Sequence, residues 1–430
     1  MKNKQNIKRL SVICMTVCTA LTGCSVIDGF ISNSDGRKSS TAVTDYDEAT
    51  RTKVKYHQAA EQDVQSAVSS EHKAIAEKTK VSSAAEYFLQ NLSDNENLVF
   101  KQIYSGLSRY ENNISIEPET IKQEEICDFI SFCTSVSPDI NYISPEYVIT
   151  IDENGYVIAL DVTYEKEEEQ SQSEKNELEQ TVDEILQGLD DGWSDYDKVK
   201  YLHDRIVLRC SYSENGVQPY SAYGCLVQGE SVCEGYSKAM LTLCQRAGIK
   251  CIPVLGKGIE NGEQEPHIWN KIMLDGQWYN FDLTWDDPIS QMGEDYVRYD
   301  YFAVTDEEIS MDHIVDSNRF MEYPEAVSTE NNYYVLNGLL VDENDNPQDI
   351  ALSSIQAAMA ENQDYARIKC ADKSVYDLAC EEIFGKNNQG SAAIFEILRE
   401  SSENSPYDYD YTSYTIIKNE NLFTITIKLR

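Results

Sequence analysis

The hydrophobic pattern is most regular between residues 194 and 288. Val199, Leu202 and Ile206 recur at the spacing of one helical face, which predicts an amphipathic helix over 196–209. Polar residues fill the positions between them, as on a helix with one face in a core. We therefore expect this helix to pack in the core of a folded domain.

A second amphipathic helix is predicted to start near Cys233. Ser231 and Glu234 fit a capping box, in which a serine and a glutamate satisfy the free amides of a helix start. Gly248 stands where a glycine C-cap is expected. Gly235 is unfavourable inside a helix, so we expect another element or a substrate to approach closely there. One face carries apolar side chains at helical spacing: Tyr236, Met240, Leu243, Cys244 and Ala247.

The hydrophobic period changes to two over 267–274 and 277–282, which predicts two strands. The dipeptide Asp275-Gly276 between them is a strong signal for a two-residue hairpin turn. In the register that follows from this turn, His267 and Asp282 are diagonal neighbours on one face of the hairpin. Diagonal neighbours lie within reach of each other's side chains.

Weaker patterns predict smaller segments on either side. A helix is expected over 84–92, and a hairpin over 147–164 around Asn154-Gly155. Residues 331–430 alternate between strand and helix and end in a hairpin around 418–421. The strands predicted there are Tyr333–Leu336, Ala366–Cys370 and Phe423–Lys428.

These patterns predict an α+β fold with smaller α/β flanking domains. Residues 25–80 are rich in Ser, Thr, Lys, Glu and Gln, which is typical of a flexible tether. The expected division is a signal peptide at 1–23, a tether at 24–80, an N-terminal α+β domain at 81–168, a central domain at 169–328 and a C-terminal α/β domain at 329–430.

The composition is strongly acidic, with a formal net charge of -38. Nucleic acid attracts basic surfaces, so this charge argues against nucleic-acid binding. The run Asp342–Asn346 superficially resembles a calcium loop, but it lacks the glycine and the distal glutamate of an EF-hand and is expected to be an ordinary loop. We predict neither a metal nor a cofactor.

The first 24 residues resemble the leader of a bacterial lipoprotein. A basic start precedes the apolar stretch Leu10–Leu21, which is too short to span a bilayer. The string Leu21-Thr-Gly-Cys24 resembles a lipobox, in which the cysteine receives lipid. We therefore expect lipidation at Cys24 and a membrane-anchored protein that faces outside the cell. The alternative is a signal peptide cleaved nearby, with an incidental Cys24.

The cysteines after Cys24 are odd in number, so at least one of them lies outside any intramolecular disulfide set. Export would permit disulfides, but their pairing stays open. These cysteines are Cys127, Cys133, Cys210, Cys225, Cys233, Cys244, Cys251, Cys370 and Cys380.

The predicted elements place three chemical groups that can act together. A cysteine at a helix start is favoured as a thiolate by the helix dipole and the free amides. A carboxylate diagonal to a histidine can fix its tautomer and stabilise its protonated form. Cys233, His267 and Asp282 are therefore candidates for nucleophile, base and orienting acid.

Structural explanations remain open for each candidate. Cys233 alone fits a small buried apolar residue, and His267 alone fits a structural histidine at a strand end. Asp286 and Asp287 are alternative carboxylates, although they fall beyond the predicted strand. The other histidines compete weakly: His57 and His72 in the tether, His203 on the first helix and His313 in an acidic loop region.

The region from Ser194 to about Pro288 resembles the transglutaminase-like superfamily, whose core is papain-like. The matching strings are Tyr223-Gly-Cys-Leu-Val227, Gly229-Glu-Ser-Val-Cys233-Glu-Gly-Tyr236, His267-x-Trp269-Asn270, Trp278-Tyr-Asn-Phe-Asp282 and Thr284-Trp-Asp286. The resemblance implies a core in which a helix that begins at a cysteine packs on an antiparallel sheet. It also implies that Cys233 is the nucleophile, His267 the base and Asp282 the orienting acid. Tyr223, upstream of the nucleophile, is a candidate oxyanion donor.

The resemblance also implies acyl transfer through a thioester. Members of the superfamily include protein cross-linkers, peptidases, deamidating enzymes and N-glycanases, which share the first half-reaction. The leading hypothesis is a cell-surface acyltransferase or hydrolase that acts on peptide or protein amides, with an amine-bearing acceptor as one option. The second is a thiol peptidase of cell-wall or environmental peptides. The third is a non-catalytic protein-binding module.

Overall fold

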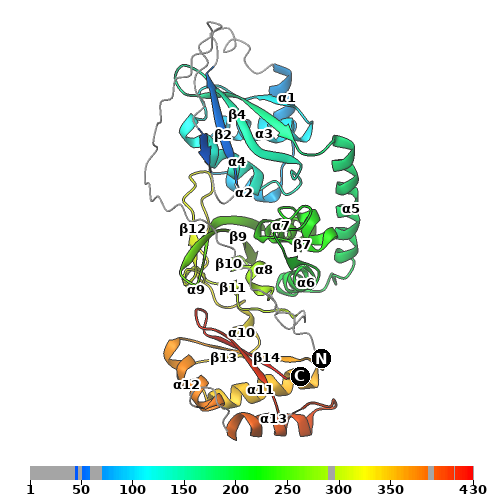
Figure 1. Ribbon diagram of the computed structural model, residues 1–430, viewed down its shortest axis with the longest axis vertical. Helices are drawn as coiled ribbons and strands as arrows, with labels where there is room; N and C mark the ends of the chain where they lie inside the picture. Colours follow the sequence, from blue (N-terminus) through cyan, green and yellow to red (C-terminus); the bar gives the residue numbers. More distant parts are fainter. Residues whose placement is uncertain are drawn as a thin grey trace, which may run out of the picture.

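The computed structural model describes residues 44–46, 51–58, 70–288, 296–385, 392–410 and 412–429. The expected signal peptide, Cys24 and part of the expected tether lie outside the described residues. Figure 1 shows three bodies stacked along the long axis, with β2 and β4 at one end, the sheet of β9, β10 and β11 in the middle, and β13 and β14 at the other end. The molecule is a mixture of helices and sheets, as predicted.

The N-terminal body is a five-stranded sheet, in the order β1-β2-β4-β5-β3, packed with helices. Its strands are β1 (Thr44–Tyr46), β2 (Lys53–Gln58), β3 (Asn113–Ser115), β4 (Ile143–Ile151) and β5 (Val157–Tyr164). Its helices are α1 (Ser70–Lys78), α2 (Ser83–Leu89), α3 (Asp94–Ser108), η1 (Gln123–Glu125) and α4 (Ile126–Ser135). The predicted helix over 84–92 and hairpin over 147–164 are confirmed as α2 and as β4 with β5.

The expectation that residues 24–80 form a flexible tether is wrong for Lys53–Gln58, which form strand β2. This strand pairs in parallel with β4, from Lys53 opposite Glu146 to Gln58 opposite Ile151. Val54 is fully buried, whereas most of its neighbours along the strand are exposed. A polar strand with one buried residue alternates too weakly for its sequence to be distinguished from that of a linker. The strand is stabilised by its long-range pairing with β4, which the local sequence does not reveal.

The central body carries a five-stranded antiparallel sheet in the order β11-β10-β9-β8-β12, against which helix α7 packs through β8 and β9. The strands of this sheet are β8 (Cys251–Glu260), β9 (Glu263–Leu274), β10 (Gln277–Phe281), β11 (Phe302–Val304) and β12 (His313–Val315). The short strands β6 (Ser211–Tyr212) and β7 (Glu230–Ser231) pair with each other in a separate parallel sheet. Its helices are α5 (Glu168–Leu186), α6 (Asp195–Val207), the π-helical turn η2 (Gly224–Gln228), α7 (Cys233–Ala247), α8 (Leu283–Asp286) and α9 (Asp306–Ile309).

The predicted hairpin register is confirmed. Leu274 pairs with Gln277 and Asn270 pairs with Phe281. Asp275 and Gly276 both have a positive φ, at 50° and 80°, as the tightest hairpin turns require. The turn therefore sets which residues of β9 and β10 share a face.

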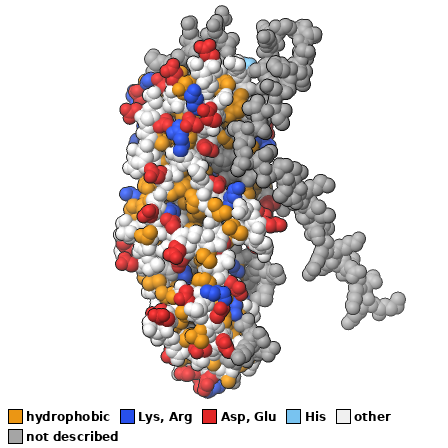
Figure 2. Space-filling view, turned by 90° about the vertical axis from the view of Figure 1, so that its left-hand side faces the viewer, with side chains coloured by type: hydrophobic (Ala, Val, Ile, Leu, Met, Phe, Trp, Pro, Cys, Tyr) orange, Lys and Arg blue, Asp and Glu red, His pale blue; other side chains and the backbone are white. Residues whose placement is uncertain are grey.

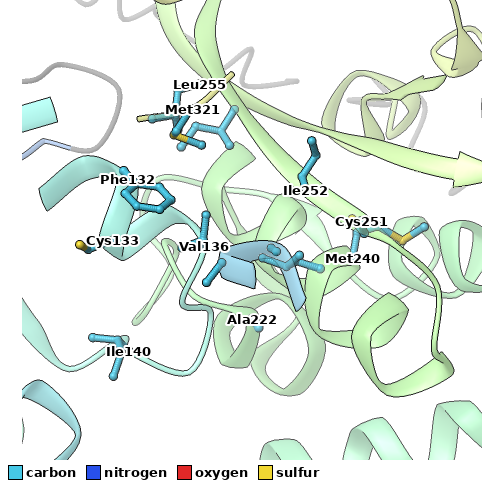
Figure 3. Close-up of a cluster of buried hydrophobic side chains, with 14 of the residues drawn as sticks. Phe132, Cys133, Val136, Ile140, Ala222, Met240, Cys251, Ile252, Leu255 and Met321 are labelled. Carbon is cyan, nitrogen blue, oxygen red and sulfur yellow. The ribbon is translucent and has the colours of Figure 1, made fainter. Parts of the chain in front are cut away.

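One hydrophobic core runs through the N-terminal and central bodies. Figure 3 shows residues from both meeting: Phe132, Cys133, Val136 and Ile140 from the N-terminal body, and Ala222, Met240, Cys251, Ile252, Leu255 and Met321 from the central body. The chain after β12 crosses to the N-terminal body, where the rings of Phe320 and Phe129 lie 4.8 Å apart. The core is continuous across the expected domain boundary between residues 168 and 169. The boundary itself stays a prediction.

The C-terminal body has its own core and a four-stranded sheet in the order β13-β14-β16-β15. Its strands are β13 (Leu340–Val341), β14 (Tyr365–Cys370), β15 (Thr415–Asn419) and β16 (Thr424–Lys428). Its helices are α11 (Pro347–Ala360), α12 (Lys373–Phe384) and α13 (Ala392–Asn404). The terminal hairpin is confirmed, and Asp342–Asn346 lies in the turn between β13 and α11.

The strand predicted at Tyr333–Leu336 is wrong, because these residues form the short helix α10. The Asn332 side chain accepts a hydrogen bond from the Tyr334 amide and caps this helix. The buried Tyr334 hydroxyl donates to Asp300 at 2.8 Å. The aromatic run therefore reflects burial of the Tyr334 ring and stacking of Tyr333 on Tyr299, with ring centres 3.9 Å apart, rather than a strand.

The face of the molecule in Figure 2 carries many acidic side chains. Figure 2 shows Asp and Glu side chains spread along the whole visible face. Within the residues that the structure describes, none of the helices combines the length and apolar character that a membrane crossing requires.

Candidate active site

Cys233 is the first residue of α7, as predicted, but the predicted capping box is wrong. Val232 is the N-cap and provides no side-chain hydrogen bond. The Ser231 hydroxyl instead donates to the carbonyl of Pro219 at 2.6 Å, and Glu234 pairs with Lys238 at 2.7 Å. The first amides of α7 are therefore not satisfied by a side-chain cap, which leaves them suited to bind a developing oxyanion.

The close approach expected at Gly235 is confirmed. A Cβ atom there would lie 1.8 Å from the Ser231 hydroxyl oxygen and 2.8 Å from the carbonyl oxygen of Pro219. The amide of Val232 also donates to the Pro219 carbonyl at 2.9 Å. The loop at Pro219 therefore packs directly on the start of α7 and fixes the position of Cys233.

The predicted contact between His267 and Asp282 is confirmed. Nε2 of His267 on β9 donates to Oδ2 of Asp282, at the end of β10, across 2.7 Å. Both side chains are buried. Oδ1 of Asp282 accepts from the amides of Thr284 and Trp285, so this residue also caps α8. The carboxylate is therefore held from two sides.

Cys233 lies beside the same imidazole, where its side chain contributes to the raised pKa of His267. Because Asp282 engages Nε2, the nitrogen that remains for the sulfur is Nδ1. The three predicted residues are thus brought together in the order thiol, imidazole and carboxylate. This is the arrangement that nucleophilic catalysis requires.

Electrostatics favours a protonated imidazole. Burial alone would lower the pKa of His267, but the charge and hydrogen bond of Asp282, with a further contribution from Cys233, raise this pKa to about 10. Burial would likewise raise the pKa of Asp282, but His267 and His313 outweigh it and hold the pKa well below its usual range. Near neutral pH the site therefore contains an ionised carboxylate and an imidazolium.

A second histidine, which the sequence reasoning placed in a loop and set aside, lies in the same cluster. Nε2 of His313 donates to Oδ2 of Asp282 at 3.0 Å, and its Nδ1 donates to Asp312 at 2.7 Å. Burial lowers the pKa of His313, but the hydrogen bonds to Asp282 and Asp312 outweigh it and raise the pKa. Its strand, β12, has three residues within an acidic segment, so no periodicity could reveal it.

The alternative carboxylates lie elsewhere. Asp286 accepts from Nε2 of His203 at 3.1 Å in a separate buried network, where burial raises the pKa of Asp286 to about 6. Asp287 accepts a hydrogen bond from the Tyr236 hydroxyl. Of the three candidate carboxylates, Asp282 is therefore the one that contacts His267.

The expectation for Tyr223 as an oxyanion donor is wrong. Its hydroxyl donates to Glu177 on α5 at 2.7 Å, and the residue lines a cavity that the triad does not line. Position upstream of the cysteine is a poor guide, because η2 turns the chain between the two residues. The uncapped amides at the start of α7 are the better candidates for this role.

The cluster has the composition of a metal site. The ligand atoms of His267, Asp282 and His313 lie within 4.8 Å of one another. The observed contacts are explained without an ion, since both histidines lie at hydrogen-bonding distance from the same carboxylate oxygen.

A cavity of about 500 Å³ lies between the N-terminal and central bodies, beside the start of α7. Glu234, the neighbour of Cys233, lines it and pairs with Arg51 at 3.2 Å. The Arg51 guanidinium lies over the ring of Tyr220, 3.2 Å from its centre. Residues from the predicted tether thus contribute to the surroundings of the nucleophile.

Comparison with known proteins places this region in a family. Residues 179–283 match the family model of the transglutaminase-like superfamily. No curated protein matches the chain at a significant level.

The chain is also similar to solved structures, at low identity and low TM-score. A proposed cysteine protease from Cytophaga hutchinsonii shares 16% identity with a TM-score of 0.22, over 30% of this chain and 52% of that one. A protein described as a TGase shares 14% identity with a TM-score of 0.24, over 59% and 67% of the two chains. A proposed protease from Parabacteroides distasonis shares 11% identity with a TM-score of 0.18, over 31% and 39%. The chain thus spans about half of the first of these proteins.

Proposed function

We propose that this chain, whose residues 179–283 form a transglutaminase-like superfamily domain, is a thiol acyltransferase or hydrolase of peptide or protein amides. The observation that carries the proposal is the buried imidazole of His267, which Asp282 holds at 2.7 Å and whose pKa the neighbouring Cys233 helps to raise. Retention of all three groups in this order argues against a purely non-catalytic binding module.

The reaction would proceed through an acyl-enzyme on Cys233. The thiolate attacks the carbonyl carbon of a carboxamide, and the first amides of α7 stabilise the oxyanion. The carbon–nitrogen bond then breaks, and the His267 imidazolium gives its proton to the departing ammonia or amine. An incoming amine or water gives a proton back to His267 and releases the acyl group from sulfur.

Asp282 keeps His267 in the orientation and tautomer that these proton transfers require. Because the carboxylate is ionised and buried, it stabilises the imidazolium without taking its proton. Proteolysis is the second candidate reaction. It would also form an acyl-enzyme on Cys233, but the bond broken would be a peptide bond of the substrate backbone and not the bond of a carboxamide.

A peptide library with an added primary amine tests the proposal. Mass spectrometry should show amine-conjugated products for transfer, glutamate in place of glutamine for deamidation, or new termini for proteolysis. Cys233→Ala should abolish each product. If no amide substrate is consumed and Cys233 is alkylated no faster than a free thiol near neutral pH, the enzymatic proposal is wrong.

We also propose that the protein is lipid-anchored through Cys24 and acts outside the cell. The proposal is supported by the basic start, the short apolar stretch and the string Leu21-Thr-Gly-Cys24. In fractionated cells, Cys24→Ala should move the protein out of the membrane fraction. An unchanged distribution would contradict the anchor.

A further inference from the structure

We propose that His313 is a positioning residue for the reaction at Cys233, and that the C-terminal body completes the active site through it. The inference rests on the proposed function, because it assigns a role to the surroundings of the same triad. It also gives the C-terminal body, which lies outside the matched segment 179–283, a part in the chemistry.

The first step of the argument is the full set of hydrogen bonds on Asp282. Oδ1 accepts from two backbone amides of α8, at 3.0 and 3.3 Å. Oδ2 accepts from His267 at 2.7 Å and from His313 at 3.0 Å. The second imidazole adds a further donor to Oδ2, the oxygen that holds His267, and so restrains the position of this oxygen.

His313 is itself held by a second carboxylate. Its Nδ1 donates to Oδ1 of Asp312 at 2.7 Å, so both of its ring nitrogens act as donors. His313 and Asp312 are 3% and 1% exposed. A buried charge is costly unless it is paired and hydrogen-bonded, and the alternation of two imidazoles with two carboxylates meets that condition.

The outer oxygen of Asp312 leads to the C-terminal body. Oδ2 accepts from the Tyr301 hydroxyl at 2.7 Å and from Nδ2 of Asn421 at 2.9 Å. Asn421 lies in the turn between β15 and β16. The chain of hydrogen bonds therefore runs from that turn through Asp312, His313 and Asp282 to His267.

The turn is built to keep Asn421 in place. Oδ1 of Asn419 accepts from the amides of Asn421 and Leu422, both at 3.1 Å. Leu422 is 2% exposed and packs in a cluster with Trp269 and Tyr301 of the central body. Because Trp269 is two residues from His267 on β9, the turn contacts the catalytic hairpin as well as Asp312.

The test uses variants that separate the hydrogen bond from mere packing. His313→Leu removes both donors, whereas His313→Gln keeps an N–H donor that can face Asp282. Asn421→Ala removes the outer donor at an exposed side chain and so spares the core. Asn404→Ala is the matched control, because Asn404 is exposed in the same body and donates only to its own helix.

We expect His313→Leu to lower kcat by about 10- to 100-fold with little change in KM, as for other partners that orient a reacting group. His313→Gln should restore most of the rate. Asn421→Ala should lower kcat severalfold, and Asn404→Ala should not change it. Wild-type kcat in both His313→Leu and Asn421→Ala would overturn the proposal.

A spectroscopic measurement needs no substrate and so separates this inference from the proposed function. The proton on the His267 nitrogen that faces Asp282 should give a downfield proton resonance in the wild type. This resonance should be sharp when the hydrogen bond is well ordered and should broaden when the hydrogen bond is loosened. It should weaken in His313→Leu and Asn421→Ala, and return in His313→Gln. An unchanged resonance in folded Asn421→Ala protein would overturn the link to the C-terminal body, even if His313→Leu fails to fold.

Discussion

At the scale of single residues, Asp282 has two structural roles, and each of its two carboxylate oxygens serves one of them. Oδ1 caps α8, and Oδ2 holds the imidazoles of His267 and His313. The cap fixes the carboxylate in the plane that the imidazole needs, so local helix formation and catalytic geometry depend on the same side chain.

Substitution of Asp282 should separate these roles. Asp282→Asn keeps an oxygen for the cap but places an amide before two imidazole N–H groups, so the pKa of His267 should fall and kcat should drop by roughly 10³- to 10⁴-fold. Asp282→Ala loses the cap too and should cost a further ~1 kcal/mol of unfolding free energy. Steady-state rates and urea denaturation measure the two effects. Equal stability of the two variants would contradict the division of roles.

The pKa of His267 predicts how stability depends on pH. Its folded value of about 10 lies above the usual ~6.5 of an unfolded histidine. The protonated imidazole therefore adds stability that is fully present below about pH 6.5 and is lost as the pH rises to about 10. The difference in unfolding free energy between wild type and His267→Gln, measured by denaturation across that range, should shrink. A difference that stays constant over that range would show that His267 is buried as a neutral imidazole.

The sequence revealed the residues whose neighbours are close in the chain. His267 and Asp282 could be placed because a two-residue turn sets their register. His313 could not, because its contact with Asp282 depends on β12 pairing with β8, more than fifty residues away in the chain. Tyr223 was misplaced for the same kind of reason, since η2 decides where its hydroxyl lies.

At the scale of elements, the start of α7 explains both the success and the failure of local patterns. Its apolar face and its Gly248 C-cap are confirmed. Its capping box is wrong, because the Pro219 loop takes the Ser231 hydroxyl. A cap formed by Ser231 would occupy amides that an oxyanion needs, so the long-range contact suits a catalytic helix start better than the local rule does.

Packing at this helix start predicts the effect of Gly235→Ala. The added methyl group would collide with backbone oxygens of Pro219 and Ser221, at 2.8 and 2.9 Å, as well as with Ser231. We expect a loss of about 1–3 kcal/mol in unfolding free energy and slower alkylation of Cys233. Gln245→Ala, at an exposed site on the same helix, should change stability by less than about 0.5 kcal/mol. Unchanged stability and alkylation in Gly235→Ala would show that the loop is free to move away.

At the scale of the whole molecule, the three bodies are joined in two different ways. The N-terminal and central bodies share a continuous apolar core. The C-terminal body has a separate main core. It meets the central body through a small apolar cluster around Leu422 and through polar contacts, such as the hydrogen bond from Arg367 to the Val297 carbonyl at 2.6 Å. Burial of apolar surface supplies most of the cooperativity in folding, so the first pair should behave as one unit.

Two matched phenylalanines test this division. Phe132 lies in the shared core and Phe384 in the C-terminal core, and both are fully buried. Truncation of either to alanine should cost about 3–5 kcal/mol within its own unit. Hydrogen exchange followed by mass spectrometry should show Phe132→Ala speeding exchange in α3, α4 and α7 together while α11 stays protected, and Phe384→Ala doing the reverse.

The same experiment links folding to the active site. Because the C-terminal turn meets the central body through its hydrogen bond to Asp312 and the small cluster around Leu422, and not through the core that holds Phe384, Phe384→Ala should disturb the order around His267 without unfolding β9. Protection of β9 amides should then persist while Cys233 alkylation slows. If β9 loses protection together with α11, the C-terminal body is part of one cooperative unit with the rest of the chain, and its role would be general stability.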